Sequence, residues 1–73
     1  MDVSLGLLLD YILTTGLVTL IMVDNSGIRK SLTFHRGKYS QKDLTTFKNQ
    51  NVIIEFEKDN KDYPELLRIQ YLR

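Results

Sequence analysis

The segment LGLLLDYILTTGLVTLIMV, residues 5–23, decides the fold because it is long, apolar and carries a single charge, at Asp10. A continuous helix of this length would be about 28 Å long, close to the roughly 30 Å hydrocarbon core of a membrane. Asp10 opposes a membrane span, since a carboxylate near the bilayer centre costs up to about 3 kcal/mol. No Lys or Arg precedes Arg29, so the segment lacks the basic flank of a span or of a signal peptide. A membrane is therefore an unfavoured partner, and a small membrane-associated protein is the residual alternative.

The spacing of polar residues predicts that this segment is divided near Gly16. Small or polar residues recur at every fourth position before it, as a helix with one narrow polar stripe requires. These residues are Asp2, Gly6, Asp10 and Thr14. Gly16 can adopt the left-handed conformation that ends a helix, and LVTLIMV after it is rich in β-branched residues. We therefore expect a helix over residues 2–15 and a strand over 17–23. That strand is apolar on both faces, which is typical of a strand covered on both sides.

The rest of the chain alternates turn signals with short apolar segments. Asp24 to Gly27, DNSG, has the composition of a tight hairpin turn. Ser40 and Asp43 resemble a capping box at the start of a short helix. The expected elements after the turn are a strand over 28–34, a helix over 41–48, a strand over 52–57 and a final strand over 65–72. The last of these also has features of a helix start, at Asp62 and Glu65, so strand and helix both stay open there.

The predicted fold class is therefore α+β, in a single domain over residues 1–73. An N-terminal helix packs on a small, mainly antiparallel four-stranded sheet, in the order α-β-β-α-β-β. In outline this resembles the Sm-like RNA-binding barrels, which also begin with a helix followed by short antiparallel strands. The resemblance rests on topology and on no sequence motif.

Composition limits the chemistry of the chain. It has 73 residues, 42% of them hydrophobic, a net charge of +1 and no cysteine, which excludes disulfides and thiolate metal sites. The absence of cysteine fits a reducing compartment, and we expect a cytoplasmic protein. The only histidine, His35, falls in an expected loop, and the acidic run 55–65 lacks the spacing of a calcium-binding EF-hand loop. We expect no catalytic residues, no metal, no cofactor, no small-molecule substrate and no enzymatic activity.

Basic residues gather between residues 29 and 48, where six of them accompany one acid, Asp43. Cations that contact phosphates, interleaved with aromatic rings that stack on bases, are what nucleic-acid binding requires. The candidate cations are Arg29, Lys30, Arg36, Lys38 and Lys42, and the aromatic residues among them are Phe34, His35 and Tyr39. A nucleic-acid-binding module that uses the basic segment 29–48 is therefore one functional hypothesis.

The expected N-terminal helix supplies the other functional hypothesis. Its polar stripe is one residue wide, and a chain this short has little material with which to surround an apolar helix. Small domains of this kind often gain stability by oligomerising. The side chains expected to mediate self-association are Val3, Leu5, Leu8, Leu9, Ile12 and Leu13. The leading hypothesis is a small non-catalytic protein-interaction or regulatory module that forms a homo-oligomer or binds a protein partner.

Overall fold

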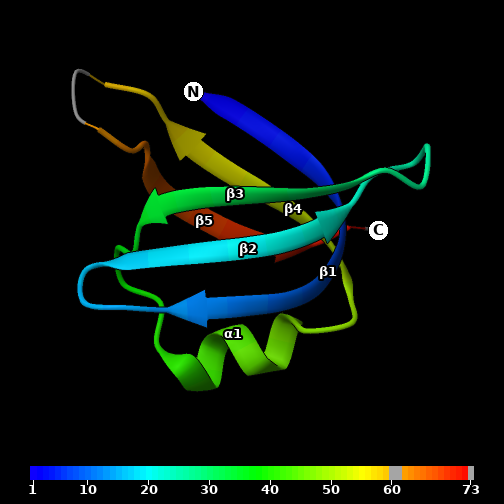
Figure 1. Cartoon of the computed structure of the whole chain (residues 1–73), viewed down its shortest axis with the longest axis horizontal. Coiled ribbons are helices and arrows are strands. Elements are labelled where there is room, and N and C mark those ends of the chain that lie inside the picture. Colours follow the sequence, from blue (N-terminus) through cyan, green and yellow to red (C-terminus); the bar gives the residue numbers. More distant parts are fainter. Residues whose placement is uncertain (60–61, 73) are drawn as a thin grey trace.

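A computed structural model of the chain describes residues 1–59 and 62–72, which form five strands and one short helix. The elements are β1 (Asp2–Leu13), β2 (Leu17–Val23), β3 (Arg29–His35), α1 (Gln41–Phe47), β4 (Asn51–Glu57) and β5 (Glu65–Tyr71). The strands close into a barrel in the order β1-β2-β3-β5-β4, and α1 lies across one end of it (Figure 1). A closed barrel of this kind does not by itself assign a function.

The predicted N-terminal helix over residues 2–15 is wrong, and so is the α+β fold class. Residues Asp2–Leu13 form the longest strand of the barrel, and the order of elements is β-β-β-α-β-β. The sheet has five strands instead of four, and the one helix described lies between β3 and β4. The helix-first outline shared with Sm-like barrels is also wrong, because the described residues that were expected to form that helix form β1.

Several local predictions are confirmed to within one or two residues. The chain does break after Leu13, and β2 spans the predicted residues 17–23. The helix begins after Ser40, whose side chain accepts a hydrogen bond from the Asp43 backbone N–H while the Asp43 carboxylate accepts one from the Ser40 N–H. The final segment is a strand, which decides the alternative left open for residues 65–72.

The barrel closes because β1 pairs with two different strands along its length. Its residues from Asp2 to Leu7 pair with β4, and those from Leu7 to Leu13 pair with β2. Leu7 belongs to both ladders, so the strand changes partner there. Gly6 makes this possible, because a Cβ at position 6 would lie 2.5 Å from the carbonyl oxygen of Val23. Any side chain at position 6 would therefore push β1 away from β2.

A β-bulge at Leu9 explains why β1 has helix-like spacing. Leu8 pairs with Met22 and Asp10 with Ile21, so Leu9 is an extra residue. An extra residue reverses which side chains face inward. The sequence therefore shows no continuous two-residue alternation across the bulge. Both faces of the strand are also rich in leucine, which is a good helix former in isolation. The four-residue recurrence of polar residues has no counterpart in the structure, where Gly6 is buried and Asp10 is exposed.

The interior of the barrel is filled from all five strands and capped by α1. The buried core residues are Leu8, Val18, Leu20, Met22, Phe34, Tyr39, Leu44, Val52, Ile54, Leu66 and Ile69. Leu44 is the fully buried side chain of α1, and Phe47 packs its ring against those of Tyr39 and Tyr71. The helix thus closes one end of the barrel, as its place beneath the strands shows (Figure 1).

The barrel is narrowly closed between β3 and β5. In the described part of the chain these two parallel strands pair only at His35 and Glu65. Beyond that point the Tyr39 hydroxyl bonds the free edge of β5: it accepts a hydrogen bond from the Ile69 N–H (2.7 Å) and faces the Ile69 carbonyl oxygen at 3.4 Å. A side chain therefore replaces a strand partner at this position.

Gly6→Ala is expected to lower the free energy of unfolding by about 1–3 kcal/mol, because the added methyl group meets a backbone oxygen that cannot rotate away. Gly27→Asn is the control. An added Cβ at Gly27 has open space, and asparagine tolerates its positive φ of 79°. Urea denaturation measures both variants. Equal stability of Gly6→Ala and the wild-type chain would contradict the role given to Gly6.

Tyr39→Phe is expected to destabilise the protein by about 1–3 kcal/mol, because it leaves the buried Ile69 N–H without a partner. Tyr11→Phe is the matched control: its hydroxyl bonds Thr45 Oγ1 (2.5 Å) at an exposed site where water can replace the lost contact. Urea denaturation compares the two. An equal loss of stability in both variants would show that Tyr39 does not stabilise the β5 edge in the way described.

Candidate interaction surface

An apolar surface runs along the outside of β1 and onto the strands on either side of it. We call it the apolar face, and its aliphatic residues are Val3, Leu5, Leu7, Leu9, Ile12, Leu17, Ile21, Val23 and Ile53. None of them belongs to the core or to the half-buried side chains that pack against it. Val3, Leu5 and Ile12 are 57%, 41% and 53% exposed. Soluble monomers rarely expose a contiguous apolar surface of this kind without a function for it.

The strand register makes this surface continuous. Leu5 lies opposite Ile53 on β4, and Leu7 lies opposite Val23 on β2. Ile12 lies opposite Thr19, whose hydroxyl bonds that of Thr33 on β3 at 2.9 Å. Opposed residues on one face of a sheet have Cβ atoms about 4.5–5.5 Å apart, so their side chains touch. The apolar face is therefore one connected surface over three strands.

β2 explains why the surface exists. Its inward residues Val18, Leu20 and Met22 are fully buried. Its outward residues Leu17, Ile21 and Val23 are also aliphatic, yet they lie outside the core. The sequence predicts a strand that is covered on both sides. Within the described chain, the core covers only the inward side of β2. The remaining side is apolar surface available for a partner.

Two acidic groups lie among the residues of the apolar face, and both are already paired within the chain. Glu55, opposite Val3, accepts a 2.7 Å hydrogen bond from Arg68 Nε. Asp10, at the bulge, lies 3.4 Å from Lys48 Nζ. The Tyr11 backbone N–H, 2.8 Å from the Asp10 carboxylate, and then Lys48 hold the pKa of Asp10 below its usual range. Asp10 lies opposite Ile21 and Glu55 opposite Val3, so the two ion pairs lie among the residues of the apolar face and leave little local excess of charge.

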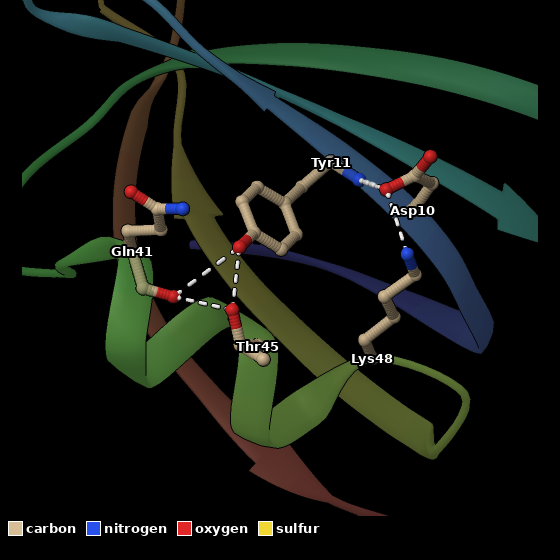
Figure 2. A network of polar contacts seen from close by, with 5 residues as sticks. All are labelled: Asp10, Tyr11, Gln41, Thr45 and Lys48. Carbon is tan, nitrogen blue, oxygen red and sulfur yellow. Dashed lines mark hydrogen bonds and ion pairs between the residues drawn. The ribbon is translucent and has the colours of Figure 1, made fainter.

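Figure 2 shows how the same part of β1 is tied to α1. The Asp10 carboxylate reaches Lys48 beyond the end of the helix, and the Tyr11 hydroxyl reaches Thr45 and the Gln41 carbonyl oxygen within it. These two neighbouring residues diverge to different parts of the helix. They hold the bulged section of β1 in place, so the apolar residues around it form a preorganised surface.

The residues predicted for self-association divide between surface and core. Val3, Leu5, Leu9 and Ile12 belong to the apolar face, whereas Leu8 is fully buried and Leu13 packs against the core. Five further members of the apolar face were not among the predicted residues: Leu7, Leu17, Ile21, Val23 and Ile53. The sequence did indicate that Leu17, Ile21 and Val23 belong to an apolar side of a strand, since residues 17–23 are apolar on both faces. Which face is covered depends on the barrel, so the pattern alone could not assign it.

The predicted basic residues do not form one surface. Arg29 and Lys30 lie at the beginning of β3, and Arg36 follows its end. Seven residues of strand separate these ends by roughly 20 Å. Lys38 lies beside the ring of Tyr39, with Nζ 5.9 Å from its centroid, and Lys42 is exposed on α1. The structure therefore brings Arg36, Lys38 and Lys42 to one end of the barrel and leaves Arg29 and Lys30 at the other.

The remaining polar residues offer little chemistry. His35 ends β3 instead of lying in an exposed loop, and its Nε2 is buried without a hydrogen-bond partner among the described residues. Residues 1–59 and 62–72 contain no cluster of three or more metal-ligating side chains. Over the same residues, no helix has both the length and the apolar character needed to cross a membrane.

Comparison with family profiles, with curated proteins and with solved structures found no match to this chain.

Asp10→Asn and Asp43→Asn are expected to destabilise the protein at neutral pH. Hydrogen bonds from the Tyr11 N–H to Asp10, and from the Ser40 N–H and hydroxyl to Asp43, hold the pKa of each carboxyl below its ordinary value of 3.8. A lowered folded-state pKa adds stability above the unfolded-state pKa, and this stability is lost as the pH falls through the folded-state pKa.

The difference between each variant and the wild-type chain should therefore shrink as the pH falls below 3.8. Urea denaturation across this pH range is the measurement. Asp2→Asn, at an exposed carboxylate outside both arrangements, is the control. A stability difference that stays constant down to acid pH would contradict the assignment.

Proposed function

We propose that this chain is a non-catalytic protein-interaction module that associates with a second copy of itself through the apolar face. The observation that carries the proposal is the aliphatic outer surface of β1 and β2, with Val3, Leu5 and Ile12 more than one-third exposed. Burial of apolar surface yields about 25 cal/mol per Å² before association costs are subtracted. A cytoplasmic location accompanies the proposal, because a chain without cysteine suits a reducing compartment.

Two features favour a second copy over a charged partner. A two-fold interface brings the same patch of both subunits together, so the patch must tolerate contact with itself. An aliphatic surface meets this condition, whereas a surface with an excess of one charge does not. The two acids among its residues are neutralised, Glu55 by Arg68 and Asp10 by Lys48, so little net charge repels the second copy.

Size supports the same partner. A chain of 73 residues buries only about 60% of the surface its unfolded form exposes, and it has no disulfide to brace it. Oligomerisation is a common source of added stability for domains this small. The half-buried members of the apolar face would become the centre of the interface, and Val3, Leu5 and Ile12 would contribute the largest newly buried area.

Ile12→Lys and Leu5→Lys are expected to weaken self-association at least tenfold, equivalent to about 1.4 kcal/mol, because each places a charge in the apolar face. Ile28→Lys is the matched control. Ile28 is 61% exposed and lies in the β2–β3 turn, outside the face, and the change in net charge is identical. Sedimentation equilibrium over a range of protein concentrations measures the association.

Circular dichroism of each variant confirms that the barrel is retained. A wild-type chain that stays monomeric at every concentration tested would overturn the proposal. So would equal weakening by Ile28→Lys, because the loss of association would then follow from net charge and not from the apolar face.

A further inference from the structure

We infer that the end of the barrel formed by loop 14–16 and the beginning of α1 is a binding site for a phosphate group. An open depression there is lined by Leu13, Thr14, Thr15, Gly16, Arg36 and Gln41. Arg36 is the one charged side chain among these residues, and no carboxylate accompanies it. The depression is separate from the apolar face, so it implies a second ligand.

Hydrogen bonds hold the lining residues in place before any ligand arrives. The Arg36 backbone N–H donates to the Gly16 carbonyl oxygen at 2.9 Å, which joins the two loops. Arg36 Nε donates to the Tyr39 carbonyl oxygen at 3.0 Å. This contact uses one donor of the guanidinium and fixes its plane, while the four N–H groups of the terminal nitrogens are not used by it. A fixed guanidinium loses less entropy on binding an anion than a mobile one.

The other side chains of the depression suit an oxyanion. Threonine hydroxyls and the glutamine amide donate hydrogen bonds, and Thr14 and Thr15 lie in a loop closed by the Thr14 N–H to Leu17 carbonyl bond at 3.0 Å. Guanidinium groups bind phosphate in bidentate geometry, which adds specificity to charge. The depression thus offers both charged and neutral donors at one place.

Two further cations flank the depression. Lys42 directly follows Gln41 on α1, and Lys38 lies two residues after Arg36 in the loop. Both are exposed. The nearest acid in the sequence, Asp43, has its carboxylate bonded to the Ser40 N–H and hydroxyl at 3.0 and 2.9 Å. Glu65, opposite His35, is the other acid at this end of β3, so three cations stand against two acids. This excess of positive charge suits a ligand with more than one phosphate, such as a single-stranded nucleic acid.

The test compares two double variants that remove the same charge from opposite ends of β3. Lys38→Ala with Lys42→Ala removes two cations beside the depression, and Arg29→Ala with Lys30→Ala removes two at the far end. Fluorescence polarisation with a labelled single-stranded oligonucleotide is measured across salt concentrations. For single strands the slope of log affinity against log salt is about 0.7 per phosphate neutralised, so the first variant should lose about 1.4 of the slope. The second should leave the slope unchanged.

A second measurement identifies the source of the phosphate. Amide shifts of Thr14, Thr15, Gly16 and Arg36 are followed by NMR during titration with inorganic phosphate and then with the oligonucleotide. Saturable shifts with inorganic phosphate would show that the depression binds an isolated phosphate group. Saturable shifts with the oligonucleotide alone would show that it requires phosphates in a chain. Each of these results supports the site.

Three results would overturn the inference. The first is the absence of saturable amide shifts with either probe. The second is an equal loss of salt slope in the two double variants, which would mean that binding follows net charge. The third is a set of shifts confined to the apolar face. None of these outcomes depends on self-association, so the two proposals fail or succeed separately.

Discussion

The change of partner along β1 is the constraint on which the rest of the structure depends. Each strand of a closed barrel has two neighbours, and β1 meets its own over different halves of its length, β4 up to Leu7 and β2 from Leu7 onward. Gly6 permits this change of partner because the Val23 carbonyl oxygen occupies the space of its missing side chain. The bulge at Leu9 then restores pairing with β2 in a shifted register. With both features in place, β1 forms one ladder of backbone hydrogen bonds with β4 and another with β2.

That constraint also creates the apolar face. Both sides of β1 and β2 are aliphatic, and one side of each fills the barrel. The other side must then lie outside, because a closed barrel has a single interior. The short helix cannot cover it, since α1 closes the end of the barrel through Leu44 and Phe47. An uncovered outer surface is thus a consequence of the closure and of the position of α1.

The charged residues follow the same geometry. β3 runs along the barrel, so cations that are neighbours in the sequence lie at its two ends, Arg29 at one and Arg36 at the other. The hydrogen bond from the Arg36 N–H to Gly16 brings the second end against the β1–β2 loop. The resulting division places an apolar surface along the strands and a cationic depression at one end. One small barrel therefore has two chemically different surfaces.

The sequence by itself determined the local elements: a break near Gly16, the strand 17–23 and the capped helix after Ser40, while it left the final segment open between strand and helix. Each depends on a few adjacent residues, such as the Ser40–Asp43 cap. For the candidate surfaces, the sequence showed only that residues 17–23 are apolar on both faces of a strand and that cations concentrate after residue 28. Only the tertiary structure decided that residues 2–13 form a strand, because leucine-rich segments have no conformational preference strong enough to oppose two ladders of backbone hydrogen bonds. It also decided which apolar residues are covered, since that depends on barrel closure between segments far apart in the chain.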